Sequence, residues 1–304
     1  MKKSRLLSVL LCLALLSGLL ATFASAADSG SAILDEMDVN AKAAVLVDPD
    51  TGEILYEKNA HAHNYPASIT KVMTCLLTLE AVDRGELSLE QSVTASSALH
   101  TGIGEGASTA DIKEGEQIRI IDLLYAALIP SANEACNVMA EAVSGDVASF
   151  VELMNTRAAE LGMEHTHFEN PNGLNDEGHY STAADMAKLA RVVMDNEILA
   201  KIVSTKSITI GARSLTNHNK LLWQYEGCVG MKTGYTDKAG RTLVSSAERD
   251  GQRLIAVTLC DPNDWRDHAA LFDYGFEEWP GAVLATAGKD VRSLPVTGAL
   301  VRFV

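Results

Sequence analysis

The chain has 304 residues, of which 47% are hydrophobic and 21% are charged, and this composition excludes a disordered or fibrous protein. Its formal net charge of −15 argues against non-specific binding to nucleic acid or to an anionic membrane surface, because both need basic patches. No linker rich in Pro, Gly or Ser divides the middle of the chain. We therefore expect one main folded unit over residues 27–279.

The first 26 residues have the pattern of a secretory signal peptide. A basic start is followed by a nearly continuous apolar run over residues 6–23, and residues 24–26 are the small side chains that signal peptidase reads. Because the apolar run is close to the length that spans a bilayer, an uncleaved anchor is the alternative. We predict cleavage and export, which removes three basic residues and no acidic one and changes the formal charge from −15 to −18.

Strands are predicted near both ends of the chain. Residues 43–58 contain two apolar-rich runs around a turn at 48–52, which predicts a hairpin. A second hairpin is predicted over residues 241–260, because Asp250-Gly251 is a strong turn signal between two apolar runs. Residues 265–279 have helical spacing. The last segment, 280–304, reads as a weak strand or tail, and we interpret it as the possible start of a truncated β-rich domain.

The middle of the chain, from about residue 68 to 203, is predicted to be mostly helical. Gly85 and Gly145 stand where helices should end, and Asp146 where one should begin. Ser181 or Thr182 followed by Asp185 resembles a capping box. An antiparallel sheet assembled from both chain ends and flanked by helices, with a helical insertion between its strands, is an α+β architecture.

Cysteine and histidine positions give no sign of a metal site. The four cysteines beyond residue 26 are widely spaced within apolar stretches, so buried free thiols are at least as well supported as disulfides. Two His-x-His pairs, at 61–63 and 165–167, have no third ligand cluster beside them in the sequence. No glycine-rich nucleotide loop follows a strand. We expect no metal and no cofactor.

The first candidate for chemistry is Ser68-Ile69-Thr70-Lys71, which opens an apolar segment just after Pro66. Residues three apart on a helix share a face, so Lys71 is expected to reach the Ser68 hydroxyl. A lysine can deprotonate a serine only in its neutral form, and burial or a second cation lowers its pKa. The pattern therefore predicts another positive group nearby. Taken alone, the pattern is better explained by a capping serine and a surface lysine.

The second candidate is Lys232-Thr233-Gly234, a tripeptide that rarely arises by chance. We expect Lys232 to supply the second cation and Thr233 to offer a hydroxyl to a substrate carboxylate. Gly234 is expected to leave room for a substrate backbone along the strand. A strand that ends in a glycine turn is the structural alternative.

The third candidate is Ser131-Ala132-Asn133, which follows a predicted helix at 120–129 and a Pro130 that ends it. Side chains at such a corner can project into a cleft. On its own, plain helix capping by Ser131 or Asn133 explains this tripeptide better.

Together, the order of these groups resembles the S-x-x-K, S-x-N and K-T-G set of penicillin-binding proteins and serine β-lactamases. Further stretches make the chain similar to the D-alanyl-D-alanine carboxypeptidase family of low-molecular-mass penicillin-binding proteins. These stretches lie at 65–68, 170–174, 180–187, 217–222 and 230–236. The resemblance spans about residues 40–278 and implies a serine β-lactamase/penicillin-binding-protein-like fold with a serine DD-peptidase catalytic domain over residues 27–279.

The resemblance implies roles for the first and third candidates. Ser68 would attack the penultimate D-Ala carbonyl and form an acyl-enzyme, with Lys71 as the general base. Ser131 and Asn133 would relay protons and hold the peptide. Ala132 stands where the family usually has glycine, and its added methyl group is expected to narrow the cleft.

The resemblance also implies roles for the second candidate. Lys232 and Thr233 would bind the terminal carboxylate, next to Gly234. The backbone N–H groups of Ser68 and Tyr235 would form the oxyanion hole.

The implied function is removal of the terminal D-Ala from peptidoglycan stem peptides by an exported enzyme at the cell wall or the outer face of the cytoplasmic membrane, with covalent binding of β-lactams. Endopeptidase cleavage of cross-links at the same site is an alternative. A serine β-lactamase is another, with Asp176 or Glu177 as the deacylating base. A catalytically silent wall-binding protein is the third. No amphipathic apolar-basic helix is visible near the C-terminus, so attachment to the membrane lacks support.

Overall fold

The computed structural model describes residues 37–281, so the predicted signal peptide and almost all of the segment 280–304 lie outside the described residues. The elements in chain order are β1 (Ala43–Val47), β2 (Ile54–Lys58), the 3₁₀ helix η1 (Ala67–Thr70), α2 (Lys71–Asp83), β3 (Ser92–Thr94), the 3₁₀ helix η2 (Ser97–His100), β4 (Gln117–Arg119), α3 (Ile120–Leu128), α4 (Asn133–Ser144), α5 (Val147–Glu160), α6 (Ala183–Asp195), α7 (Glu197–Ser204), β5 (Ser207–Ile210), β6 (Arg213–Thr216), α8 (Leu221–Gln224), β7 (Cys228–Gly230), β8 (Thr233–Thr236), β9 (Gly240–Arg249), β10 (Gln252–Leu259) and α9 (Asp264–Glu278).

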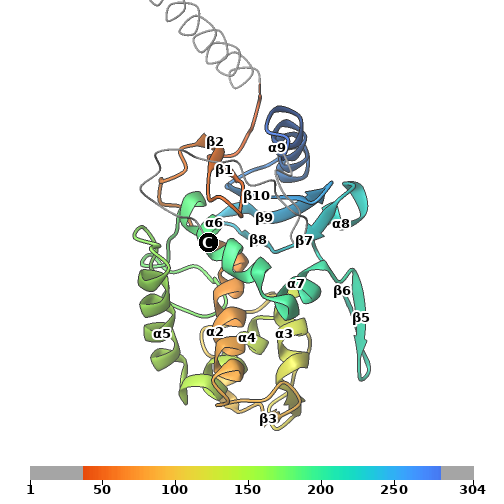
Figure 1. Ribbon diagram of the computed structural model, residues 1–304. Coiled ribbons are helices and arrows are strands. Elements are labelled where there is room, and N and C mark those ends of the chain that lie inside the picture. Colours follow the sequence, from red (N-terminus) through yellow and green to blue (C-terminus); the bar gives the residue numbers. More distant parts are fainter. Residues whose placement is uncertain (1–36, 282–304) are drawn as a thin grey trace, which may run out of the picture.

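The main sheet is antiparallel and joins the two ends of the described chain, as the sequence predicts. Its strand order is β2-β1-β10-β9-β7, and β8 also pairs with β9. β1 lies in register with β10, from Ala43 opposite Leu259 to Val47 opposite Ile255. Figure 1 shows the sheet at one end of the molecule and the helices α2 to α5 at the other, so the α+β prediction is confirmed.

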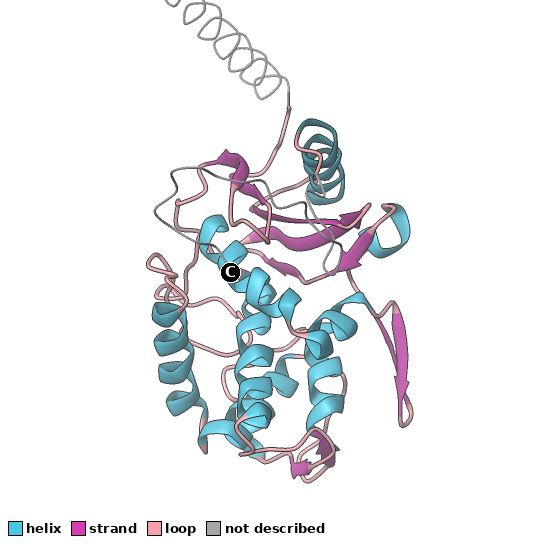
Figure 2. Ribbon diagram, in the orientation of Figure 1, coloured by secondary structure: helices cyan, strands magenta, loops and turns pink. Residues whose placement is uncertain are grey.

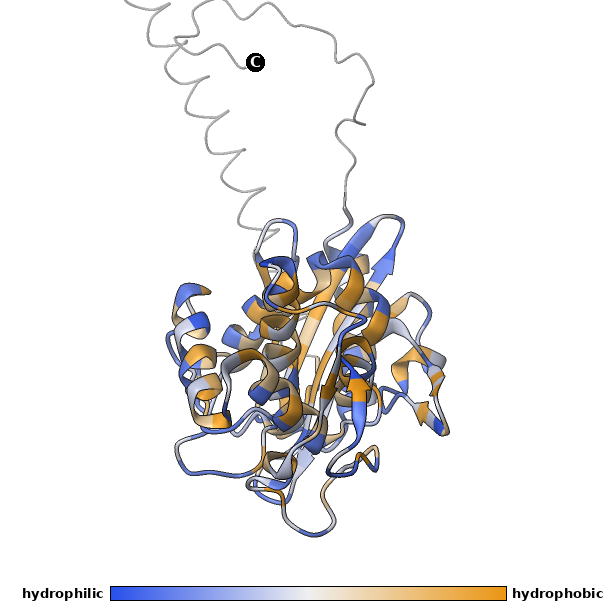
Figure 3. Ribbon diagram, turned by 90° about the horizontal axis from the view of Figure 1, so that it is seen from below, coloured by the Kyte–Doolittle hydropathy of each residue, from blue (hydrophilic) through white to orange (hydrophobic). Residues whose placement is uncertain are grey.

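The central strands are buried on both faces, which places two hydrophobic cores against one sheet. In β1, Ala43, Val45 and Val47 contribute to the larger core, while Ala44 and Leu46 face the smaller one. This alternation follows from the two-residue period of a strand. α9 covers the smaller core, and α6 packs against the face of the larger one. Figure 3 shows the hydrophobic strands lying between these helices.

The helical part is organised around α2, whose residues from Lys71 to Leu79 are all buried. α3, α4, α5 and α6 pack around it, as Figure 2 shows. A helix buried on most of its sides needs apolar residues around its circumference, and Met73 and Leu77 extend the apolar face in that way. This buried helix begins directly beneath the sheet.

Local signals in the sequence correspond closely to the observed turns and caps. Asp250 and Gly251 form the two-residue loop between β9 and β10, both with positive φ, as a primed hairpin turn requires. The side chain of Thr182 accepts a hydrogen bond from the N–H of Asp185 and caps α6. The helical middle also contains the short β3–β4 pair, which the sequence analysis missed.

The described cysteines, Cys75, Cys136, Cys228 and Cys260, are all free thiols. Burial raises the pKa of the Cys136 thiol to about 12, so this group is an inert part of the core. Within residues 37–281, no helix combines the length and apolar character that crossing a membrane requires.

Candidate active site

Ser68 lies in η1, the 3₁₀ turn that precedes α2, rather than in the first turn of the α-helix. Ala67, the residue before it, has a φ of 51°, a left-handed conformation that is unfavourable for an alanine. Lys71 is the first residue of α2. The tight turn therefore brings the Ser68 hydroxyl back toward the buried start of the helix.

Lys71 is completely buried and its ammonium nitrogen has three partners. It donates to Ser68 Oγ at 2.8 Å, to Asn133 Oδ1 at 2.9 Å and to the backbone oxygen of Asn172 at 2.6 Å. Burial lowers the pKa of Lys71 to about 8, because the charged form loses its hydration. The capping-serine and surface-lysine alternative is therefore wrong.

Lys232 is the second buried cation that the first motif requires. Its side chain is 1% exposed, and its ammonium donates to the backbone oxygen of Thr233 at 2.8 Å. Burial, and after it the positive charge of Lys71, lowers the pKa of Lys232 to about 7. At neutral pH the two lysines therefore resist being charged at the same time.

The corner between α3 and α4 presents two polar side chains to this pair. Ser131 has a φ of 67°, and its hydroxyl oxygen is buried without a hydrogen-bond partner among residues 37–281. Asn133 donates from Nδ2 to the backbone oxygen of Ser108 at 2.9 Å while its Oδ1 binds Lys71. Neither side chain caps α4, so the capping interpretation is wrong.

Ala132 does not narrow the cleft. Its side chain is fully buried in the larger hydrophobic core, and its N–H donates to the backbone oxygen of Ala126 at 2.9 Å. Ala132 is therefore packed in the core and does not line the cleft, whereas Ser131 and Asn133 do.

The loop around Asn172 is hydrogen-bonded to the first turn of α2. Thr74 Oγ1 donates to the backbone oxygen of Pro171 at 2.5 Å, next to the bond between Lys71 and Asn172. Gly173 has a φ of 84°, and a Cβ there would lie 1.9 Å from the backbone oxygen of Ala67. Glycine is required for this close approach, which supports η1 from behind.

Gly234 has a different purpose from the one expected. A Cβ at this position would lie 2.3 Å from Thr242 Oγ1, 2.9 Å from the nitrogen of Ser68 and 3.1 Å from the oxygen of Pro66. The space beside it is thus occupied by the protein itself. The glycine lets β8 approach the turn that carries Ser68.

We expect Gly234→Ala to slow acylation by about 100-fold, because displacing the serine by about 1 Å is enough for such a loss. The added methyl group also overpacks the contact, at a cost of about 1–3 kcal/mol in the free energy of unfolding. Stopped-flow acylation and thermal unfolding measure the two effects. Gly104→Ala is the control, because no atom lies within 4 Å of a Cβ there. A Gly234→Ala enzyme that acylates at the wild-type rate would contradict this account.

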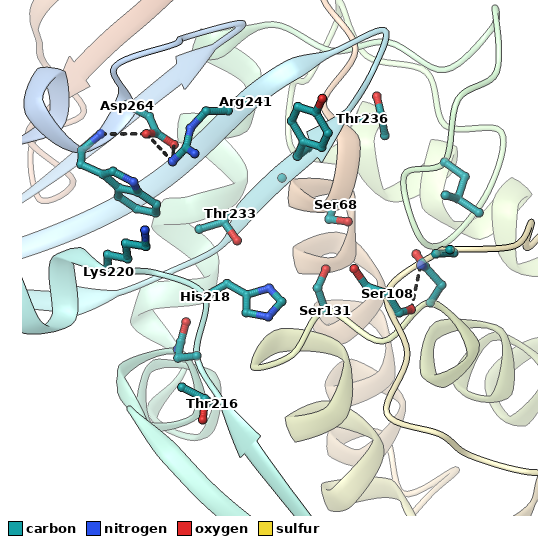
Figure 4. A pocket seen from close by; sticks show the side chains of 18 of the residues that line it. Ser68, Ser108, Ser131, Thr216, His218, Lys220, Thr233, Thr236, Arg241 and Asp264 are labelled. Carbon is teal, nitrogen blue, oxygen red and sulfur yellow. Dashed lines mark hydrogen bonds and ion pairs between the residues drawn. The ribbon is translucent and has the colours of Figure 1, made fainter.

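The polar groups converge on a cleft of about 700 Å³ between the sheet and the helical part. Six of the eight predicted residues line it: Ser68, Ser131, Asn133, Thr233, Gly234 and Tyr235. Lys71 and Lys232 lie buried beneath its floor. Figure 4 shows Ser68 and Ser131 facing the same space, with Thr233 and His218 to one side of Ser68 and Thr236 to the other.

Several cleft residues were not singled out by the sequence analysis. His218 and Lys220 line the end near Thr233. Partial burial and then the charges of Lys232 and Lys71 lower the pKa of His218. Their only signal in the sequence was the family-like stretch at 217–222, which carries no chemical pattern of its own.

A charged pair closes the far wall of the cleft. Arg241 donates to Asp264 Oδ1 at 2.7 Å, and its guanidinium lies 5.1 Å from the ring centroid of Trp265. Asp264 is the first residue of α9. It is the one acidic residue in the cleft lining, so the cleft is locally cationic in an otherwise acidic protein.

Two alternatives from the sequence receive no support from the geometry. Asp176 and Glu177 do not line the cleft, so neither is placed to activate a deacylating water beside Ser68. The two His-x-His pairs approach each other, with the ring of His165 5.9 Å from that of His63. Residues 37–281 nevertheless contain no set of three or more ligands arranged for a metal ion.

Comparison with known families decides the relationship. The family described as D-alanyl-D-alanine carboxypeptidase matches residues 29–263 of the chain. The chain belongs to this family. The D-alanyl-D-alanine carboxypeptidase DacF of Bacillus subtilis is a relative at 35% identity over 277 residues, which cover 88% of this chain and 70% of the relative.

Solved carboxypeptidase-family structures have the same fold. Penicillin-binding protein 6B from Escherichia coli superimposes with a TM-score of 0.75 at 32% identity, covering 79% of this chain and 78% of the other. Penicillin-binding protein D2 from Listeria monocytogenes, in its ampicillin-bound form, gives 0.71 at 31% identity, covering 79% and 99%. The predicted penicillin-binding-protein-like fold is confirmed.

Proposed function

We propose that this chain is an exported serine carboxypeptidase that removes the terminal D-Ala of peptidoglycan stem peptides through an acyl-enzyme on Ser68. The observation that carries the proposal is the contact of 2.8 Å between Lys71 Nζ and Ser68 Oγ at the cleft floor. A neutral lysine has two N–H groups and one lone pair. Asn133 Oδ1 and the Asn172 oxygen accept both N–H groups, which leaves the lone pair for the serine proton.

In the acylation step, Ser68 Oγ attacks the carbonyl carbon of the penultimate D-Ala while Lys71 takes the hydroxyl proton. The backbone N–H groups of Ser68 and Tyr235 stabilise the resulting oxyanion, each with about 3–4 kcal/mol. Collapse of the intermediate breaks the C–N bond, and the departing amine receives a proton passed from Lys71 through Ser131. The unpartnered buried hydroxyl of Ser131 suits this relay.

The terminal carboxylate of the substrate lies at the Thr233 end of the cleft. The hydroxyl of Thr233 and the nearby charges of Lys220 and buried Lys232 favour an anion there. A carboxylate beside Lys232 stabilises the protonated form of that lysine. A protonated Lys232 in turn favours a neutral Lys71, so substrate binding prepares the general base.

Hydrolysis of the acyl-enzyme completes the reaction. A water molecule that enters after D-Ala has left attacks the ester carbonyl, with Lys71 again accepting the proton, and Ser68 is released. An opened β-lactam keeps its amine covalently attached to the acyl group, so the leaving group cannot depart to admit water. A long-lived adduct is expected, and the ampicillin-bound relative supports the assignment of β-lactams as ligands.

The substrate and the first 26 residues support export. Peptidoglycan lies outside the cytoplasmic membrane, and a basic start, an apolar run and a small-residue triplet precede the catalytic domain that we assign to residues 27–279. The mature protein is therefore expected to begin at Ala27 and to act at the wall or on the outer face of the membrane.

Intact-mass spectrometry of the exported protein, with and without benzylpenicillin, tests the proposal. We expect a mature mass that begins at Ala27, one stable penicilloyl adduct, and D-Ala released from a stem pentapeptide in a parallel assay. Rapid turnover of the drug would instead indicate a β-lactamase. Cleavage of a cross-linked dimer in preference to the pentapeptide would indicate an endopeptidase, and no adduct with no release would indicate a silent wall-binding protein.

A further inference from the structure

A second hollow of about 330 Å³ lies outside the cleft and has no part in the chemistry described above. Its walls include Lys42, His63, Tyr65, Glu177, Tyr180 and Lys238. Glu177 is the one acidic residue among its lining residues, opposite two lysines. In a chain with a net charge of −15, this is a local excess of positive charge.

Three of the residues that line the second hollow belong to segments that also build the active site. Tyr65 precedes Ser68 by three residues. Lys238 lies in the turn directly after β8, which carries Thr233 and Thr236. Glu177 follows Leu174, a cleft residue, in the same loop. Thr236 Oγ1 also binds Asn175 Oδ1 at 2.7 Å and joins two of these segments.

The walls are held in place by contacts within the protein. The rings of His63 and Tyr180 stack with centroids 4.4 Å apart, and Lys238 Nζ lies 6.0 Å from the ring centroid of Tyr65. Behind them, Asn64 and Ser181 exchange two backbone hydrogen bonds of 2.9 Å. The second hollow is therefore preformed, with exposed lysine side chains above aromatic walls.

In the proposed orientation of the substrate, its upstream residues are directed toward the second hollow. With the terminal carboxylate at Thr233 and the scissile carbonyl at Ser68, the upstream residues must run along β8 toward Thr236. Beyond Thr236 the chain turns at Lys238, beside the hollow. An extended peptide advances about 3.4 Å per residue. The penultimate D-Ala covers the first step from the site of cleavage, so the two residues before the D-Ala pair extend from about 3 Å to about 10 Å beyond that site, toward the second hollow.

We propose that the second hollow binds a free carboxylate of the stem peptide upstream of the D-Ala-D-Ala bond, with Lys238 and Lys42 as its cations. This inference rests on the proposed function. Stem peptides carry such a carboxylate on their second residue, a γ-linked D-glutamate, and two lysines at an otherwise acidic surface select it by charge. The hollow then sets the preference among peptides, while Ser68 and Lys71 carry out the chemistry.

Two pentapeptides that differ in one group test the proposal. N-acetyl-L-Ala-γ-D-Glu-L-Lys-D-Ala-D-Ala is compared with the same peptide amidated at the D-glutamyl α-carboxylate. We expect the wild type to favour the acidic peptide in kcat/KM by about three- to tenfold, as expected for one partly exposed charge-assisted contact. Lys238→Gln and Lys42→Gln should each reduce this preference, and the double variant should abolish it.

The controls separate the hollow from the active site. Lys201→Gln, an exposed lysine on α7, should keep the full preference. Acylation by benzylpenicillin, whose upstream side chain is uncharged, should be unchanged in every variant. Equal kcat/KM for the two peptides in the wild type, or a preference that persists in the double variant, would overturn the inference.

Affinity gives a readout independent of turnover. Calorimetric titration of the two peptides into Ser68→Ala protein should show the same preference for the acidic peptide. If the wild type released D-Ala from neither peptide while this difference in affinity persisted, the proposed function would fail and the hollow would stand. Release of D-Ala from both peptides without any difference in affinity would contradict the proposed carboxylate site alone.

Discussion

Ser68→Ala should eliminate the penicilloyl adduct and lower D-Ala release by about 10⁴-fold or more, because Ser68 carries the one cleft-lining hydroxyl group in residues 37–281 that is hydrogen-bonded to a buried lysine. The substitution removes one oxygen and leaves Lys71 bound to Asn133 and to the Asn172 backbone. We therefore expect the fold to persist, with a far-UV spectrum and a melting temperature close to those of the wild type.

The measurement is intact-mass spectrometry after incubation with benzylpenicillin, together with a D-amino-acid assay on the pentapeptide. Ser92→Ala is the matched control: Ser92 is an exposed serine on β3 that does not line the cleft, so this variant should react normally. An adduct of the same mass on Ser68→Ala protein would show that a different residue is the nucleophile.

Lys232→Gln should produce the second large effect, a loss of about 100-fold in kcat/KM for acylation together with a displaced pH profile. Lys71 must be neutral to accept the serine proton, so acylation falls as the pH drops through the pKa of Lys71, about 8. With a carboxylate ligand bound, Lys232 is expected to be protonated, and its charge then favours the neutral form of Lys71; Lys232→Gln removes this repulsion. The pKa of Lys71 then rises, and the acid limb of the profile moves to higher pH, by on the order of one unit.

Stopped-flow acylation between about pH 5 and pH 10 measures the displacement, and thermal unfolding shows whether the variant is folded. Because Lys232 is buried, Lys232→Arg is a second variant that keeps the positive charge: its acid limb should stay closer to that of the wild type. A limb that stays in place in Lys232→Gln, or moves to lower pH, would contradict the coupling between the two lysines.

The hairpins and the helix caps could be predicted from the sequence because their signals are local. Asp250-Gly251 is a turn by its own chemistry, and Thr182 caps α6 with an oxygen that accepts a hydrogen bond from the N–H three residues later. The motif residues Ser68, Ser131 and Lys232 were likewise found through short patterns. Their convergence depended on the family resemblance, because spacing alone does not bring segments together.

Contacts between segments that are far apart in the chain could not be predicted from the sequence. The role of Asn172 is carried by its backbone oxygen, which any residue possesses, so no side-chain pattern could reveal it. Gly234 was assigned to the substrate because the approach of η1 to β8 cannot be read from either segment alone. His218 enters the cleft through packing of the segment between β6 and α8, and nothing adjacent to it signals a site.

Backbone strain was the least predictable property. Ala67, Ser131 and Met231 have φ values of 51°, 67° and 92°, although none is glycine. Each lies at or immediately before a proposed catalytic or substrate-binding residue. Such conformations cost about 1–3 kcal/mol each and persist only where the surrounding structure imposes them. The buried part of α2, from Lys71 to Leu79, and the main sheet supply that support.

The pairing of β1 with β10 also governs how the protein reaches its active form. The strand that precedes the nucleophile finds its partner only near the opposite end of the described chain, so a large loop must close before the two cores can assemble. Long-range pairing of this kind slows folding, and a nascent chain that lacks β10 cannot complete the sheet. The hydrolase should therefore gain activity in a single late step, after nearly all of its catalytic domain has been synthesised.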